Sequence, residues 1–194
     1  LYSSAASDVY KRQKMTREDA QVKSVLNAVT GPIKRTTWRV DPNGADEALV
    51  RMVAEDLNLP VKGEEVALPY RRSPRRVSWN AHLARVLRWS LTYGHAYFEL
   101  VFDDATQTED GLTHLRKIAP RHPASLVKIG VADDGGLEYV EQYGRNGKPV
   151  RIPVQNLLAY LHEDDDDLWL GESMFRAAYK HWMLKDCLLY TSDA

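Results

Sequence analysis

The sequence predicts an α+β fold in which helices flank a run of short antiparallel strands and hairpins. Near both ends of the chain, apolar side chains recur every three or four residues, the spacing of an amphipathic helix. In the middle of the chain the spacing changes to every second residue, and glycine-rich turn sequences interrupt it. Helices on either side of a run of hairpins indicate segregated elements, the pattern of an α+β fold.

The first helix is predicted to begin at Thr16, because Thr16-Arg17-Glu18-Asp19 has the form of a capping box with Asp in the usual Glu or Gln position. Its apolar stripe is Val22, Val25, Leu26 and Val29. Gly31-Pro32 is predicted to end this helix. Residues 33–40, rich in Thr and containing Trp38, are predicted to form a strand that stops at the turn Asp41-Pro42-Asn43-Gly44.

A second helix is predicted between this turn and Pro60. Its apolar stripe is Leu49, Met52, Val53 and Leu57. Residues 60–78 contain Pro60, Gly63, Pro69 and Pro74 and show little periodicity. They predict a loop that includes a short strand at residues 65–68.

The third helix is predicted from the N-cap Ser78 to the stop at Gly94. Its apolar face is Trp79, Leu83, Val86, Leu87, Ser90 and Leu91. A strand follows at once, because Ala96, Phe98, Leu100 and Phe102 alternate with the residues between them. We expect the helix stripe and the apolar strand face to pack together across Gly94.

Residues 112–154 predict successive short strands, with three of them at 126–131, 137–143 and 149–154. The connections Asp133-Asp134-Gly135-Gly136 and Gly144-Arg145-Asn146-Gly147 are typical hairpin turns. Residues 156–162 add a further strand. After Gly171-Glu172-Ser173, a last helix is predicted from the stripe Phe175, Ala178, Tyr179, Trp182 and Met183.

The two ends of the chain resemble translated sequencing adapter. Residues 3–13 are what the mosaic-end adapter of transposase-prepared libraries encodes, and residues 187–194 match the reverse complement of the same oligonucleotide. Two such peptides would rarely meet at opposite ends of one chain by chance. We therefore expect residues 1–13 and 187–194 to be adapter-derived, and residues 14–186 to be the biological segment, cut at its C-terminus.

Composition narrows the class of protein. The formal net charge is -1, which argues against a surface built entirely for nucleic acid. The single cysteine, Cys187, lies in the predicted adapter-derived end, so a disulfide framework is excluded. The sequence contains no apolar run near the ~18 residues of a membrane span, so no membrane association is predicted.

An acidic run follows His162 and consists of Glu163, Asp164, Asp165, Asp166 and Asp167. Such oxygens could hold Mg²⁺ or Ca²⁺ in a metal-dependent hydrolase. Contiguous carboxylates do not converge on one ion, and the alternating ligands of an EF-hand are missing. A solvated acidic loop without metal is therefore predicted, with the hydrolase as an alternative.

A basic cluster precedes the third helix and consists of Arg71, Arg72, Arg75 and Arg76, with Trp79 nearby. Guanidinium groups pair with carboxylates at protein interfaces, and our interpretation is that the cluster pairs with carboxylates of a neighbouring subunit or of the same chain. A solvated surface without a partner is a further interpretation. Contact with nucleic acid through phosphates and a stacked base is the alternative, for which affinity should fall steeply with salt.

Other combinations of polar residues predict no catalytic, cofactor or metal site. His95, Glu99 and Asp103 share one predicted strand and its end, but no nucleophile accompanies them, so a structural role is predicted. Gly171-Glu172-Ser173 lacks the second glycine of a nucleophile elbow. Residues 144–147 match the clamp loop of a KH domain only as a four-residue pattern that a hairpin explains better. The chain is predicted not to be an enzyme.

The order of elements resembles the N-terminal half of tailed-bacteriophage portal proteins, the head-tail connectors. The segments that carry the resemblance are residues 31–38, 91–102, 149–153 and 170–182. Within them, Tyr93-Gly94 enters a strand that contains Glu99, and Gly171-Glu172-Ser173 opens a helix that reaches Lys185. The resemblance covers nearly all of residues 16–186 in order.

The resemblance implies a structural protein without cofactors. It implies that the subunits form a ring, a dodecamer in the family, at one capsid vertex of the virion. The ring would assemble in the host cytoplasm, and double-stranded DNA would pass through it during packaging and ejection. The implied partners are further copies of the chain, terminase, the major capsid protein and a head-tail adaptor. Residues 14–186 would form a wing-like region, with stem, clip, tunnel loop and crown downstream. Arg71, Arg72, Arg75 and Arg76 of one copy are candidates to pair with Asp164, Asp165, Asp166 and Asp167 of the next.

Overall fold

The computed structural model describes residues 2–64, 78–104, 106, 108, 110–144, 146–164 and 168–192, with the backbone alone for 2–7 and 189–192. The helices are α1 (Tyr2–Glu18), α2 (Ala20–Arg35), α3 (Glu47–Leu57), α4 (Trp79–Tyr93) and α5 (Tyr179–Ser192). The strands are β1 (His95–Phe102), β2 (Leu115–Arg121), β3 (Leu126–Val131), β4 (Leu137–Tyr143), β5 (Pro149–Pro153) and β6 (Leu157–Leu161). Short 3-10 turns, η2 (Pro123–Ser125) and η3 (Val154–Asn156), join strands.

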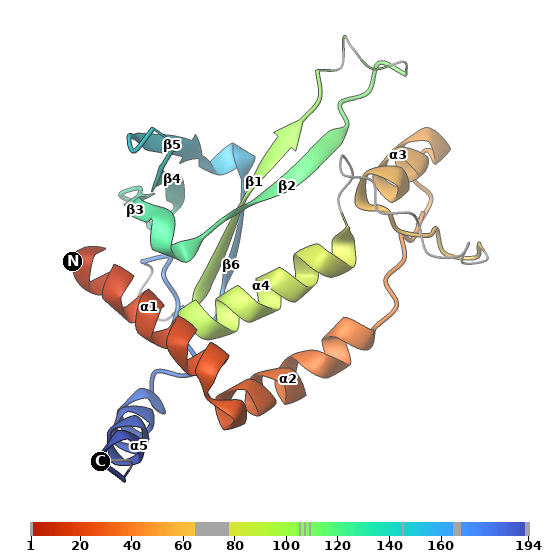
Figure 1. Cartoon of the computed structure of the whole chain (residues 1–194). Helices are drawn as coiled ribbons and strands as arrows, with labels where there is room; N and C mark the ends of the chain where they lie inside the picture. The colour runs from red at the N-terminus through yellow and green to blue at the C-terminus, as the bar shows by residue number, and fades with distance from the viewer. Residues whose placement is uncertain are drawn as a thin grey trace.

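The strands form two antiparallel sheets of three strands each, in the orders β2-β1-β6 and β3-β4-β5. Figure 1 shows α4 lying along the first sheet, with α2 beyond it and α1 crossing near their ends. The predicted α+β class is confirmed.

Strand β1 is buried on both of its faces near its start. Ala96 and Phe98, both 0% exposed, pack with Val86 of α4. Tyr97, on the opposite face, packs with Val140 and other residues of the second sheet. The alternation of residues 95–102 therefore separates two cores, whereas the sequence predicted one apolar face and one polar face.

The predicted start of the first helix is wrong. Thr16 lies inside α1, where its hydroxyl donates to the carbonyl of Gln13 at 3.0 Å. The helix cap is Asp19, three residues later, whose carboxylate accepts from the amides of Gln21 and Val22 and begins α2. The carboxylate of Asp19 caps the free amides at the start of α2 better than the hydroxyl of Thr16 would, because it carries a negative charge next to the helix N-terminus. The boundary between the two helices therefore lies at Asp19.

The predicted helix end at Gly31-Pro32 and the strand at 33–40 are also wrong. Helix α2 contains Pro32 and continues to Arg35. Because Pro32 lies in the last turn, its missing N–H removes only one hydrogen bond near the helix end, a smaller disruption than in mid-helix. Within 33–40, only Val40 pairs like a strand residue, in an isolated parallel bridge with Val61.

The remaining boundaries follow the prediction more closely. Helix α3 is capped by Asp46 and ends at Asn58 in the left-handed region. Helix α4 begins after Ser78 and ends at Gly94, as predicted. Strands β3, β4, β5 and β6 lie within one residue of the predicted bounds. The predicted strand at 65–68 lies outside the described residues.

The buried face of α4 differs from the predicted stripe. Its buried residues include His82, Val86 and Ser90, whereas Leu83 and Leu87 are only half-buried. The predicted stripe faces a single core, whereas α4 packs on the sheet with one side and near α2 with another. Leu91, for example, joins the cluster of Met15, Leu26 and Phe175.

The last helix begins later than predicted, at Tyr179. Residues 174–178 form turns, and within them Phe175 is 3% exposed and packs with Met15 and Leu26. The helical spacing of residues 175–183 therefore begins in turns and ends in α5.

Helices α1 and α5 run into the ends that were predicted to be adapter-derived. In α1, Val9 is buried and Arg12 donates to the carbonyl of Tyr93 at 3.4 Å. A helical conformation does not reveal the origin of a sequence, so the origin of residues 1–13 and 187–194 stays a prediction. None of the described helices is both long enough and apolar enough to cross a membrane.

Candidate functional site

Two glycines, Gly94 and Gly171, bring together the segments 91–102 and 170–182. Both have positive φ angles, 95° and 58°. A Cβ added to Gly94 would lie 2.4 Å from the carbonyl oxygen of Gly171, and one added to Gly171 would lie 2.2 Å from that of Gly94. Only glycine fits at either position, because any side chain would collide with the other backbone. We call this contact the glycine junction.

Backbone and imidazole hydrogen bonds surround the glycine junction. The amide of His162 donates to the carbonyl of Gly94 at 2.8 Å, and Nδ1 of His162 lies 2.8 Å from the carbonyl of Glu172. On the other side, Nδ1 of His95 lies 2.8 Å from the carbonyl of Leu170. The two histidines therefore hold the end of α4, the start of β1 and residues 170–172 in one arrangement.

Ser173 is buried beside the glycine junction and is fully engaged there. Its hydroxyl donates to the carbonyl of Thr92 at 2.6 Å and accepts from the amide of Phe175 at 3.2 Å. A serine whose hydroxyl bonds two backbone groups at 3% exposure has no access to a substrate. Ser173 thus positions the turn before α5.

The three polar residues of β1 and its end have separate partners. Burial lowers the pKa of His95 to about 4, so the ring is neutral, and Nδ1 carries the proton that it donates to the carbonyl of Leu170. Glu99 pairs with Arg121 of β2, and Asp103 pairs with Arg116 at 3.6 Å. The structure does not combine them into an acid-base site.

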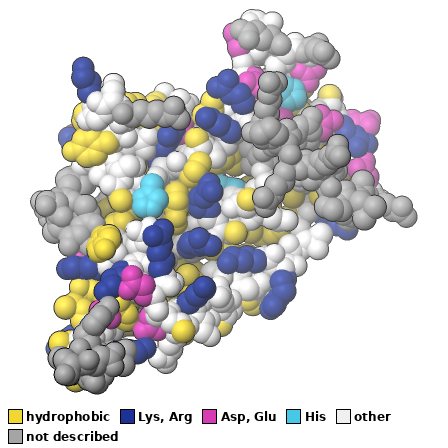
Figure 2. All heavy atoms as spheres, viewed as in Figure 1, with side chains coloured by type: hydrophobic (Ala, Val, Ile, Leu, Met, Phe, Trp, Pro, Cys, Tyr) yellow, Lys and Arg dark blue, Asp and Glu magenta, His cyan; other side chains and the backbone are white. Residues whose placement is uncertain are grey.

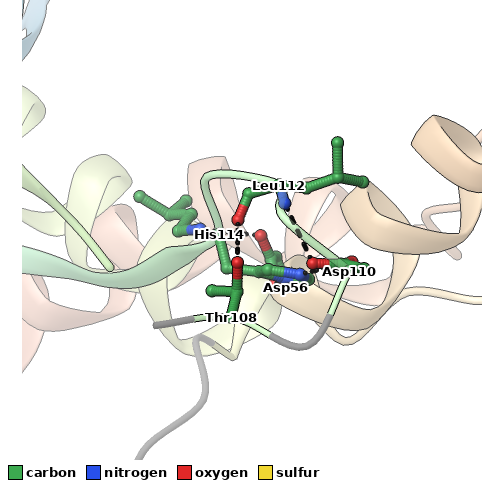
Figure 3. A network of polar contacts seen from close by, with 6 residues as sticks. Asp56, Thr108, Asp110, Leu112 and His114 are labelled. Carbon is green, nitrogen blue, oxygen red and sulfur yellow. Dashed lines mark hydrogen bonds and ion pairs between the residues drawn. The ribbon is translucent and has the colours of Figure 1, made fainter. Parts of the chain in front are cut away.

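A histidine clasp that the sequence did not indicate joins α3 to the segment between β1 and β2 (Figure 3). His114 lies between two carboxylates, with Nδ1 2.8 Å from Asp56 of α3 and Nε2 3.0 Å from Asp110. Asp56 also accepts from the amide of Leu115 at 2.7 Å, and Asp110 accepts from that of Leu112 at 3.0 Å. The three residues are separated by up to 58 positions, too far apart for a local motif to reveal them.

The electrostatics of the clasp favour an imidazolium. Hydrogen bonds to Asp56 and then to Asp110 raise the pKa of His114. The amide of Leu112, followed by the His114 ring, lowers the pKa of Asp110. Both ring nitrogens are occupied by carboxylates, so His114 has no nitrogen available as a general base and acts as a cross-link.

A comparison with protein families decides the class of this protein. The family model described as the portal protein of Mu bacteriophage matches residues 8–190. The chain belongs to this family. The resemblance to phage portal proteins is thereby confirmed, and the portal family is a structural one that forms rings within the capsid. The match extends into both predicted adapter-derived ends, and their origin stays a prediction.

The predicted interface of this portal protein falls mostly outside the described residues. Arg71, Arg72, Arg75 and Arg76 and also Asp165, Asp166 and Asp167 lie there. Asp164 is half-buried, and neighbouring Glu163 is exposed with a φ of 51°. Among the described residues, no group of three or more His, Cys, Asp or Glu side chains is arranged to hold a metal ion.

Proposed function

We propose that this chain is the N-terminal, wing-like part of a structural subunit of the phage portal ring. The ring would occupy one capsid vertex of the virion, conduct double-stranded DNA during packaging and ejection, and provide the head-tail joining site. The observation that carries this proposal is the family match across residues 8–190. A dodecamer that assembles in the host cytoplasm, with terminase, the major capsid protein and a head-tail adaptor as partners, follows from the resemblance.

An exposed apolar stripe on α2 supports a role in assembly. Val25, Val29 and Ile33 are 46%, 45% and 38% exposed and recur at intervals of four residues on one side of the helix. A ring subunit needs two different surfaces that fit each other, because its contacts are heterologous. The α2 stripe is a suitable apolar half of such a contact.

The charge pairing proposed for neighbouring subunits joins the cluster Arg71, Arg72, Arg75 and Arg76 to Asp164, Asp165, Asp166 and Asp167. Exposed ion pairs contribute about 0–1 kcal/mol each. Association must first offset several kcal/mol of lost rigid-body freedom, so these pairs would orient subunits without closing a ring alone.

A structural role also accounts for the polar residues better than an enzymatic one. Ser173, His95 and His162 bond backbone groups of their own fold, and His114 bonds two carboxylates. We propose that the chain is not an enzyme. A nucleic-acid-binding module that uses Arg71–76 remains the rival, and its test is salt-sensitive binding without turnover that is lost when these arginines are replaced.

Negative-stain imaging of the complete gene product tests the proposal. We expect particles of one size with a central channel, whereas residues 14–186 alone should be monomeric or polydisperse by light scattering at micromolar concentration. A complete product without channelled particles at high concentration and low salt would contradict ring formation. Sequencing the gene from its source DNA tests the ends, where codons for other residues are expected at 1–13 and 187–194.

A further inference from the structure

A band of positive charge crosses one face of the molecule. Helix α2 contains Lys and Arg, and helix α4 contains Arg, and neither helix contains Asp or Glu. Figure 2 shows Lys and Arg side chains gathered over these elements, with most of the visible acidic side chains towards the edges of the face. We define the basic band as Arg17 at the end of α1, Lys23 and Lys34 of α2, and Arg85 and Arg88 of α4, all of them exposed. Lys117 of β2 pairs with Val101 and so lies on the face of the sheet away from α4, outside the band. The whole chain has a net charge of -1. The basic band therefore arises because basic residues are gathered on one face, and not because the chain has an excess of positive charge.

The centre of the basic band is a cluster of arginines from two helices. Arg85 and Arg88 are three residues apart and so lie on one side of α4. Arg85 lies over the ring of Trp89 at 5.8 Å, and that ring contacts His122 at 5.3 Å. The charges of Arg17 and Arg88 both act on the phenol of Tyr93, which places the end of α1 beside α4.

The cations of the band have no carboxylate partner among the described residues. The arginines of β2 differ, because Arg116 and Arg121 pair with Asp103, just after β1, and Glu99 of β1. Like charges held close together destabilise a fold, so an unpaired cluster is favourable chiefly when an external anion meets it. The charge of the band is therefore directed outward.

The chemistry of the band favours a nucleic acid over an acidic protein. The core of a protein interface is apolar and depleted of lysine, whereas DNA interfaces are strongly positive and wet. The large exposed apolar side chains of the described residues include none on α4 or β2. On α2, Lys23 and Lys34 lie three turns apart on one side, away from the Val25, Val29 and Ile33 stripe.

The aromatic rings of the band favour a duplex over a single strand. Trp89 stacks on Phe98 in the core, and Tyr93 is 5% exposed, so neither presents a free face on which an unpaired base could stack. Helix α4 has 15 residues and is thus about 22 Å long. Duplex DNA carries one phosphate charge per ~1.7 Å of its axis, so it offers phosphates along the whole helix.

We propose that the basic band binds the phosphate backbone of double-stranded DNA independently of base sequence. The contact is made by the side chains of one chain, so it requires neither ring formation nor the arginine cluster at residues 71–76. A failure of the ring experiment leaves this proposal standing, and the reverse also holds.

The test is fluorescence anisotropy of a labelled duplex titrated with the chain of 194 residues at several salt concentrations. We compare the double variant Arg85→Gln/Arg88→Gln with the matched control Lys148→Gln/Lys180→Gln, which removes two exposed positive charges elsewhere. A second comparison is Arg71→Gln/Arg72→Gln. All substituted residues that the structure describes are exposed, so unfolding midpoints should stay nearly equal.

We expect the chain to bind two unrelated duplex sequences equally, with an affinity that falls steeply with salt. Losing two phosphate contacts should lower the slope of log affinity against log salt by about 1.8 and weaken binding at 100 mM salt about tenfold or more. The Lys148/Lys180 control should bind like the unaltered chain.

Four results would overturn the proposal. Equal binding by the Arg85/Arg88 variant and its control would remove the band from the contact, as would a loss confined to the Arg71/Arg72 variant. Displacement of the duplex by poly-glutamate at the same charge concentration would assign the band to an acidic protein surface. Tighter binding of a single-stranded oligonucleotide than of the duplex would contradict the assignment to double-stranded DNA.

Discussion

Replacing Gly94 by alanine should destabilise the fold through two separable effects. The φ of 95° is costly for any residue with a Cβ, by about 1–2 kcal/mol. The new methyl group would also lie 2.4 Å from the carbonyl oxygen and 2.9 Å from the preceding carbonyl oxygen of the facing backbone, at Gly171 and Leu170. Relieving such overpacking typically costs about 1–3 kcal/mol, so a total of about 2–5 kcal/mol is expected.

Gly44→Ala is the matched control for the backbone effect. Gly44 has a φ of 80°, and a Cβ added there meets nothing within 4 Å. The free energy of unfolding of each variant is measured by urea denaturation, followed by circular dichroism and tryptophan fluorescence. Gly94→Ala should lose about 1–3 kcal/mol more than Gly44→Ala. Equal losses would show that the glycine junction does not require close backbone approach, and our account of residues 91–102 and 170–182 would be wrong.

Three further predictions concern the clasp, the core and the acidic run. The raised pKa of His114 means that its contribution to stability is complete below pH 6.5, its ordinary value, and is lost as pH rises through the folded-state pKa. His114→Gln should therefore cost about 1–3 kcal/mol at pH 5.5 and less at pH 8.5 in urea titrations, and an equal cost at both would refute the clasp. Phe98→Ala should cost about 3–5 kcal/mol by thermal unfolding, whereas Phe102→Ala, on the same strand but 44% exposed, should cost much less; similar losses would contradict the packing of β1. Changing residues 164–167 together to Asn should alter no Mg²⁺- or Mn²⁺-dependent hydrolysis, since none is expected, and specific turnover that disappears with this change would support an enzyme.

Features that depend on a few neighbouring residues, such as helix ends and hairpin turns, could be predicted from the sequence. Ser78 and Gly94 mark the ends of α4, because a side-chain cap and a left-handed glycine are local requirements. The turns at residues 133–136 and 144–147 likewise fixed the order of the second sheet, whose strands pair with their sequence neighbours. The family resemblance rested on such segments and their order.

Features that depend on contacts between distant residues were not predictable. Pro32 signals a helix end, yet α2 continues past it, since tertiary packing of an amphipathic helix outweighs one lost hydrogen bond. The burial of Tyr97 follows from a second sheet that covers β1, and His95 is buried where it bonds the carbonyl of Leu170. The alternation of β1 alone reveals neither contact. The clasp of His114 required α3 and the β1–β2 connection to meet, and the basic band required three elements to share a face.

The measurement that tests the central claim most directly is native mass spectrometry of the complete gene product. The portal account predicts one assembly whose mass is a fixed multiple of the subunit mass, with twelve subunits as the expected number by resemblance to the family. The portal account would be contradicted if the spectra showed only monomers, or a continuous range of masses, at concentrations where other ring proteins assemble.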